Sequence, residues 1–279
     1  MSEAGARAFV PGHVTAFFSP ALASDPAQAG SRGAGLTLSD GVTVTVQPAD
    51  ESQLYLNDEA AVIEAADRVL AALEATARVD AETRLPVGAG FGVSGAVALG
   101  TALAATAGLP TVDARSENDL VTVAHRAEVE AGTGLGDVVA QARGGIPIRL
   151  EAGGPGYGRM DGIPTTTRVE YVSYGEVSTP DVLAGDTGRI ETVGDRALQR
   201  LTGAPTLATF MAGARDFAFE TGLVTDRVRE AIEAVEGIGG LASMAMLGET
   251  VFAVGTGLSE AGYDPVVCRT HPPGATIER

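Results

Sequence analysis

The sequence contains no lysine, so all 19 of its basic side chains other than histidine are arginines. A P-loop needs a lysine after its second glycine, and a protein kinase needs a lysine on a strand beside its nucleotide. Enzymes that use pyridoxal phosphate hold it through a lysine Schiff base. The absence of lysine therefore excludes these three kinds of site.

Cysteine, tryptophan and long apolar runs are also scarce. Cys268 is the sole cysteine, which excludes an internal disulfide and a zinc site built from cysteines. Aromatic residues make up 5% of the chain and apolar residues 45%, so the expected core consists mainly of Ala, Val and Leu. No apolar run reaches the roughly 20 residues of a membrane span. The N-terminus has no basic segment before an apolar stretch, so we expect no signal peptide and a cytoplasmic protein.

Positive charge is scarce as well, because the formal net charge is −17. Nucleic acids and anionic membranes are bound through basic patches, so neither is an expected partner. An acidic, lysine-free composition is typical of proteins adapted to a high-salt cytoplasm, where salt screens the repulsion between like charges. The alternative is an acidic protein from a GC-rich genome without such adaptation.

The length of 279 residues predicts about two domains. The glycine-rich stretch 153–158 is the predicted boundary, which divides the chain into residues 1–155 and 156–279. In the first part we expect a strand with a turn at residues 11–13, a loop at 29–35 and a hairpin that turns at 39–41.

Hydrophobic periodicity predicts the helices. A long helix is expected over Asn57–Val79, with Val62, Ala66, Val69, Leu70 and Leu73 on one face. A second helix is expected over Ser94–Ala107. Ser116 and Asp119 form a capping-box pattern for a third helix that ends at Gly132. The second part of the chain reads as alternating strands (168–173, 242–246, 251–254) and helices (195–201, 207–220, 226–235), which favours an α+β fold of two lobes.

The most informative segment is a glycine-rich loop, residues 85–93, that leads directly into the helix of small residues. Glycines at alternate positions let the backbone approach a ligand closely, and the helix start offers free N–H groups to an anion such as phosphate. Without lysine, a phosphate here would be held by backbone amides, the Ser94 hydroxyl and a metal ion. The alternative is a glycine-rich turn packed under a helix.

Two acidic residues complete a candidate site for phosphoryl transfer. Glu128 shares a helix face with Val121 and His125, and Asp137 begins a short helix after the loop 133–136. Glu128 and Ser94 have the oxygen ligands that hold Mg²⁺ on nucleotide phosphates, and Asp137 is suited to act on an acceptor hydroxyl. The structural alternatives are a solvated helix position for Glu128 and a helix N-cap for Asp137.

These segments resemble the motifs of the GHMP kinase superfamily. Residues 86–98 resemble its second motif, P-x-x-x-G-L-G-S-S-A-A, with Phe91 in place of leucine, Val93 and Ser94 in place of the serines and Gly95 in place of an alanine. Residues 8–13 resemble its first motif, A-P-G-K, with His13 in place of lysine. Residues 134–137, followed by two glycines at 144–145, resemble the segment that holds the catalytic aspartate. The third, glycine-rich motif is blurred, and 237–240 and 247–249 both stay open for it.

Within the superfamily, the blocks 11–15, 30–35, 133–138 and 178–183 are similar to the pantoate kinases of archaea. The resemblance implies ATP-dependent phosphorylation of the primary hydroxyl of (R)-pantoate, which gives 4-phosphopantoate for coenzyme A synthesis. It implies an N-terminal lobe with a left-handed βαβ unit and a C-terminal ferredoxin-like lobe. The superfamily often forms homodimers. The alternatives are a kinase of another small alcohol (mevalonate, homoserine or shikimate) and a non-catalytic nucleotide-binding sensor.

The resemblance also implies roles for single residues. Asp137, Ser94 and Glu128 are the expected catalytic residues, and Ser94 and Glu128 the expected ligands of Mg²⁺. The residues expected to contact the ATP phosphates lie in and after the loop: Pro86, Gly88, Ala89, Gly90, Phe91, Gly92, Val93, Ser94, Gly95 and Ala96. Arginine binds carboxylates bidentately, so Arg149 is the first choice for the pantoate carboxylate. The further residues expected in the substrate pocket are His125, Thr179, His13 and Arg32, with Arg143 as an alternative to Arg149.

Overall fold

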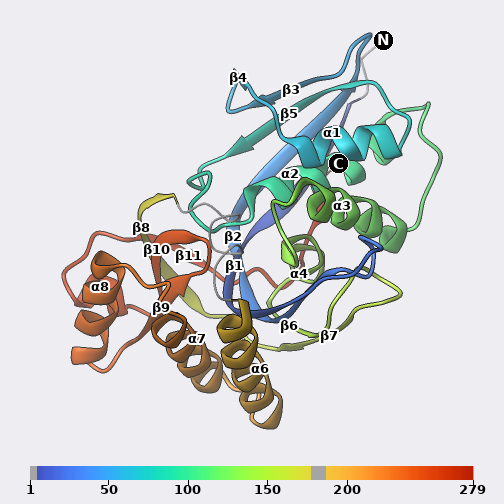
Figure 1. The fold of residues 1–279 in the computed structure, drawn as a ribbon. Coiled ribbons are helices and arrows are strands. Elements are labelled where there is room, and N and C mark those ends of the chain that lie inside the picture. The colour runs from blue at the N-terminus through green and yellow to red at the C-terminus, as the bar shows by residue number, and fades with distance from the viewer. Residues whose placement is uncertain (1–4, 177–186, 279) are drawn as a thin grey trace.

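The computed structural model describes residues 5–176 and 187–278, whose strands form one sheet of eight strands and one of four (Figure 1). The first sheet contains β1 (Ala6–Ala21), β2 (Gly30–Pro48), β3 (Gln53–Leu56), β4 (Glu59–Ala60), β5 (Ala77–Thr83), β6 (Ile146–Glu151), β7 (Arg159–Ile163) and β12 (Thr276–Glu278). The second sheet contains β8 (Arg168–Glu176), β9 (Leu241–Ala245), β10 (Gly248–Val254) and β11 (Val266–Arg269). The helices described are α1 (Glu64–Ala72), α2 (Val93–Gly108), α3 (Glu117–Ala131), α4 (Asp137–Arg143), α6 (Thr187–Gly203), α7 (Leu207–Thr221), α8 (Asp226–Gly237) and α9 (Gly257–Glu260).

The first sheet is built on the long antiparallel pair β1 and β2, which runs diagonally through the larger part of the molecule in Figure 1. The predicted turn at residues 11–13, the loop at 29–35 and the hairpin turn at 39–41 are therefore wrong, because all of these residues except Ala29 lie within the two strands. Pro11 faces Gly41 while His13 faces Thr37, so β2 carries extra residues opposite Gly12. Such a bulge bends a strand without ending it, and the glycine and polar residues there mark the bulge.

The predicted helix Asn57–Val79 is wrong at both ends. Helix α1 covers only its middle, where Ala66, Val69 and Leu70 are buried as expected, but Val62 precedes the helix and is 89% exposed. Asn57 and Asp58 have positive φ angles of 51° and 66° and form the two-residue turn between β3 and β4. This is the backbone conformation that favours Asn and Asp in tight hairpins.

Strands β3 and β5 pair in parallel, with α1 between them in sequence, so they form the βαβ unit of the first lobe. The start of β5 had been included in the predicted helix. Its burial alternates along Ala77, Arg78, Val79, Asp80 and Ala81, which is the period of a strand with one buried face.

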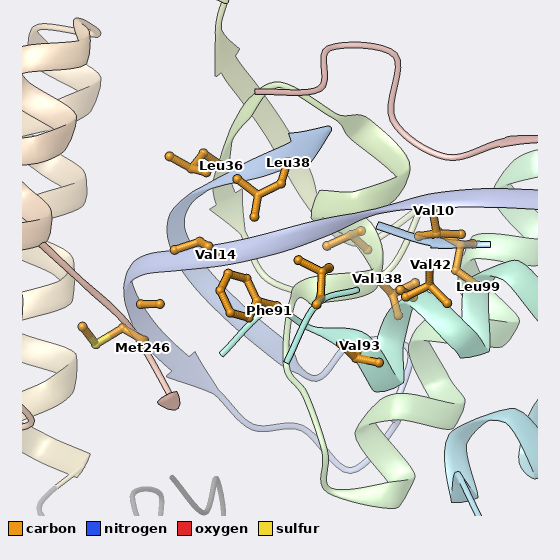
Figure 2. Close-up of a cluster of buried hydrophobic side chains, with 14 of the residues drawn as sticks. Val10, Val14, Leu36, Leu38, Val42, Phe91, Val93, Leu99, Val138 and Met246 are labelled. Carbon is orange, nitrogen blue, oxygen red and sulfur yellow. The ribbon is translucent and has the colours of Figure 1, made fainter. Parts of the chain in front are cut away.

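Helix α2 confirms the predicted helix at 94–107 and lies against β1 and β2 on one side and α1 and α3 on the other. Its alanine and glycine residues allow this close packing on several sides. Figure 2 shows Val93 and Leu99 of α2 in one apolar cluster with Val10, Val42 and Phe91. The N-terminus of α2 is thus held in the core next to the glycine-rich loop.

Helices α3 and α4 follow the predicted pattern. The capping box of Ser116 and Asp119 is present, and α3 ends at Gly132. Residues 153–158 form the turn that joins β6 to β7 in the first sheet. The division of the chain into domains at 155 stays a prediction.

The second sheet has the order β11-β8-β10-β9 and lies with α6, α7 and α8 in the lower left of Figure 1. Helix α7, which packs against β9 of this sheet, contacts the first lobe through aromatic pairs, because Phe17 and Phe18 of β1 lie beside its Phe210 and Phe217. In the described part of the chain, no helix combines the length and apolar character needed to cross a membrane.

Candidate active site

The glycine-rich loop joins β5 to α2 and has the conformation that its glycines predict. Gly88, Gly90 and Gly92 have φ angles of 74°, 87° and 62°. Gly92 is the N-cap of α2 and provides no side-chain cap, so the first N–H groups of the helix have neither an intrahelical nor a capping partner. This arrangement is suited to bind an anion.

A cavity of about 320 Å³ lies against this loop. The predicted phosphate-contacting residues Gly88, Gly90, Phe91, Gly92, Val93 and Ser94 line it, whereas Pro86, Ala89, Gly95 and Ala96 do not. Thr133 and Asp137 line it from the side of α4, and Met246 and Leu247 line it from the turn between β9 and β10. Of the two segments left open for the third glycine motif, the segment 247–249 is thus the one beside the loop.

Ser94 lines this cavity and is hydrogen-bonded to Glu128, which does not line it. The Ser94 hydroxyl donates to Glu128 Oε1 at 2.6 Å, and Glu128 is only 2% exposed, which excludes a solvated helix position. Burial raises the pKa of Glu128 to about 7, and the negative charge of Asp137 adds to this, while the hydrogen bond from Ser94 acts against it. Within residues 5–176 and 187–278, Glu128 Oε2 has no hydrogen-bond partner.

These oxygens fit a hard divalent cation, since one carboxylate oxygen has no partner and the other contacts a hydroxyl. Among the residues that the structure describes, no group of three or more His, Cys, Asp or Glu side chains could hold a metal. Mg²⁺ on Ser94 and Glu128 would therefore need phosphate and water oxygens to complete its ligands.

Asp137 is held by His13 of β1. The His13 Nδ1–H donates to Asp137 Oδ1 at 2.7 Å. Burial lowers the pKa of His13, so the ring is neutral. Burial alone would raise the pKa of Asp137, but the hydrogen bond from His13 and the positive charge of Arg149 outweigh it and lower that pKa. Asp137 is therefore an ionised carboxylate with a fixed orientation, and it is the first residue of α4 rather than its N-cap.

Arg149 of β6 is a buried cation with little compensation. It is 2% exposed, its Nε donates to the Ser31 carbonyl at 3.3 Å, and its Nη1 has no hydrogen-bond partner among the residues that the structure describes. Burial lowers its pKa to about 10, against the charge of Asp137, which raises it. Gly136 is required here, because a Cβ at that position would lie 2.6 Å from Arg149 Nε. An unpaired buried guanidinium is suited to bind a carboxylate.

A small second cavity lies beside the first. Its volume is about 20 Å³, and it is lined by Thr15, Phe18, Ser31, Leu247 and the segment 134–137. Asp137, Thr15 and Leu247 line both cavities, so Asp137 lies where the two meet.

The remaining predicted substrate residues are placed differently. The His125 ring is 1% exposed and its Nε2 lies 2.8 Å from the Ala29 carbonyl. Arg32 forms an ion pair with Asp195 of α6 at 2.8 Å. Thr179 lies outside the described residues. The roles of these residues stay predictions.

Two buried residues next to the loop had not been singled out from the sequence. Gln141 lies one turn after Asp137 on α4 and donates to the Gly92 carbonyl at 2.8 Å. Thr250 of β10 donates to the Ala89 carbonyl at 2.9 Å. The four-residue spacing from Asp137 was a signal for Gln141, whereas Thr250 comes to the loop only through the tertiary structure.

A separate cavity of about 310 Å³ lies between α2, α3 and β12. Leucines 99, 103 and 120 line it, and neither Glu128 nor Asp137 does. Asp137, Ser94 and the glycine loop line the first cavity, and Glu128 is hydrogen-bonded to Ser94 without lining it, so the first cavity is the candidate active site.

The chain is similar to known kinases over most of its length. The family description "GHMP kinases N terminal domain" matches residues 60–145. The pantoate kinase of Thermococcus kodakarensis is 36% identical over 89% of this chain and 87% of its own length. The pantoate kinase of Methanocaldococcus jannaschii is 32% identical over 88% of this chain and 91% of its own length.

Solved structures agree with this similarity. A phosphotransferase related to the coenzyme A biosynthesis pathway superposes with a TM-score of 0.87, is 31% identical and covers 99% of both chains. A homoserine kinase from Cytophaga hutchinsonii has a TM-score of 0.72 at 15% identity, covers 100% of this chain and 98% of its own, and supports the fold alone. The chain therefore belongs to the GHMP kinases, and within them to the family of the pantoate kinases.

Proposed function

We propose that this protein transfers the γ-phosphoryl group of ATP to the primary hydroxyl of (R)-pantoate, which gives 4-phosphopantoate for coenzyme A biosynthesis. The observation that carries the proposal is the buried Arg149 guanidinium, which lies behind Gly136 and acts electrostatically on Asp137, the carboxylate that lines both cavities. It provides a carboxylate-binding cation next to a carboxylate that can act on a hydroxyl. The similarity to pantoate kinases supports the same substrate.

The glycine loop and the start of α2 bind the phosphates in this proposal. Their N–H groups need no side-chain cation, which accords with a chain without lysine. Ser94 and Glu128 hold Mg²⁺ through oxygen atoms. When bound, Mg²⁺ neutralises charge on the phosphate oxygens.

Asp137 orients the acceptor hydroxyl and takes its proton. The hydroxyl oxygen of pantoate forms a bond to the γ-phosphorus, the bond from that phosphorus to the bridging oxygen of ADP breaks, and ADP leaves with the electron pair. The hydroxyl proton moves to the Asp137 carboxylate and then to solvent. The lowered pKa of Asp137 fits a loose transition state, in which the proton leaves late.

His13 keeps Asp137 in place in this mechanism. Its neutral ring donates one N–H to the carboxylate and adds no charge. We therefore assign His13 a positioning role in place of direct contact with pantoate.

Arg149 binds the pantoate carboxylate bidentately in the proposal. A local cation is needed, because the net charge of −17 repels an anionic substrate. Leu247 lines both cavities and offers apolar surface to the methyl groups of pantoate. His125 and Thr179 complete the pocket, and Arg32 contributes through its ion pair with Asp195.

The composition and the family support inferences about the source, the cellular environment and the assembly of this protein. We infer an archaeal protein that works in a salt-rich cytoplasm, because acidic, lysine-free surfaces are favoured when salt screens repulsion. We also infer two domains that divide at residue 155, a homodimer, and no nucleic-acid or membrane partner.

The decisive experiment measures ADP release at high KCl with ATP, Mg²⁺ and pantoate, beside mevalonate, homoserine and shikimate. Turnover with pantoate alone is the expected result, and Asp137→Asn is the inactive control. Turnover only with another alcohol would reject pantoate and keep the kinase. ATP binding by folded protein without turnover of any acceptor would favour a nucleotide sensor.

A further inference from the structure

Gln141 is a fully buried polar side chain on the helix that carries Asp137. Its exposed fraction is 0%. It follows Asp137 by four residues on α4, so the two side chains lie on the same face of the helix. A buried amide needs hydrogen-bond partners, and those that Gln141 has belong to the candidate active site.

Gln141 connects α4 to the N-terminus of α2. Its Nε2 donates to the Gly92 carbonyl at 2.8 Å, and the same carbonyl accepts the first helical hydrogen bond of α2, from Ala96 N at 3.0 Å. Gly92 has no side chain with which to cap the helix. The amide of Gln141 therefore fixes the peptide at which the phosphate-type loop becomes a helix.

The amide also lies between the two carboxylates of the site. A Cβ at Gly92 would lie 3.1 Å from both Asp137 Oδ1 and Gln141 Nε2. A Cβ at Gly95 would lie 3.2 Å from Gln141 Oε1 and 3.3 Å from Glu128 Oε2. Gln141 is thus a neutral group near both Asp137 and Glu128.

The orientation of the amide follows from its contact with Gly92. The opposite orientation would place Oε1 against a carbonyl oxygen, where no hydrogen bond forms. In this orientation Oε1 is buried and has no hydrogen-bond partner in the described part of the chain. The one hydrogen bond to Gly92 is therefore what holds the side chain in this position.

We propose that Gln141 is a positioning residue. It sets the distance between the Asp137 carboxylate, which takes the proton of the acceptor hydroxyl, and the start of α2, where the backbone and Ser94 bind phosphate. The inference rests on the proposed phosphoryl transfer. In that reaction, a displacement of the carboxylate by about 1 Å relative to the phosphate lowers the rate on the order of 100-fold.

The test compares Gln141→Met, Gln141→Glu and the control Thr101→Val at high KCl. Methionine keeps the length of the side chain and removes the hydrogen bond to Gly92. Thr101 is also fully buried, on α2, and its hydroxyl has no partner, so its substitution changes a buried polar group away from the site. The measurements are kcat, the KM for pantoate, the Kd for ATP without acceptor, and the unfolding temperature.

We expect Gln141→Met to lower kcat about 10- to 100-fold and to weaken ATP binding severalfold, with little change in the KM for pantoate. Thr101→Val keeps its kcat. In Gln141→Glu, a protonated carboxyl can donate to the Gly92 carbonyl, so its activity relative to the native protein rises as the pH falls. The activity of Gln141→Met relative to the native protein does not rise as the pH falls.

Native kcat and ATP affinity in both Gln141 variants, in folded protein, would overturn the inference. An equal loss of kcat in Thr101→Val would also overturn it, because any buried polar change would then have the same effect. If the native protein binds ATP but does not phosphorylate pantoate, the proposed function fails. The effect of Gln141 on ATP binding is still measured in that case, so the two failures are distinct.

Discussion

Arg149→Met tests the proposed substrate contact most directly. Methionine fills a similar volume without charge or N–H donors. In the native protein the guanidinium is buried, and its Nη1 has no partner. The substitution therefore removes a binding group for a carboxylate while breaking few contacts within the protein.

The expected effects of Arg149→Met on stability and on pantoate affinity both follow from the surroundings of Arg149. Burial lowers its pKa from 12.5 to about 10, which corresponds to about 3 kcal/mol against the charged form in the folded state. The penalty is present at every pH below about 10, so Arg149→Met is at least as stable as the native protein at pH 7. Loss of one partner from a buried charge pair costs about 3 kcal/mol, which is roughly 100-fold in affinity.

The assay varies pantoate at saturating ATP and then ATP at saturating pantoate, both at high KCl. The KM for pantoate is expected to rise about 100-fold, and the KM for ATP to stay within about threefold of the native value. Thermal unfolding without ligand measures the stability of both proteins. Added pantoate should raise the unfolding temperature of the native protein and leave that of Arg149→Met unchanged. Equal increases in both KM values, or a variant that is destabilised but binds pantoate normally, would refute the reasoning.

Three further predictions address the rest of the site. Asp137→Asn keeps the hydrogen bond from His13 but cannot take a proton, so kcat falls by at least about 100-fold while the Kd for ATP is unchanged in a binding titration. The pKa of Glu128 is raised to about 7, so in nucleotide-free protein with EDTA stability falls as the pH rises from about 4.5 to 7, by up to about 3 kcal/mol. Glu128→Gln should flatten that pH dependence in denaturant unfolding, and an unchanged slope would contradict the assignment. Thr250→Val leaves the buried Ala89 carbonyl without the hydroxyl that donates to it, and such an unsatisfied carbonyl costs about 1–3 kcal/mol. The KM for ATP should therefore rise severalfold. Unchanged kinetics would mean that this hydrogen bond does not hold the loop.

Local chemistry determined several elements directly. The capping box of Ser116 and Asp119 and the glycine at 132 predicted both ends of α3, because caps act through hydrogen bonds between near neighbours in the chain. The alternating glycines before α2 likewise predicted the positive φ angles of the loop. The elements that failed, such as the helix at 57–79, were decided by strand pairing with distant residues, which overrides local periodicity.

Local sequence therefore predicted the chemistry available to the site: an anion-binding loop without lysine, a hydroxyl at 94, carboxylates at 128 and 137, and an arginine at 149. Only the tertiary structure decided that His13 holds Asp137, that Arg149 is buried without a full set of partners, and that Gln141 joins α4 to α2. These contacts link residues that are 49 to 124 positions apart, and burial lowers the pKa values of His13 and Arg149. Neither the distance in space nor the loss of water around a side chain is encoded in local sequence, because both arise when separate elements pack together.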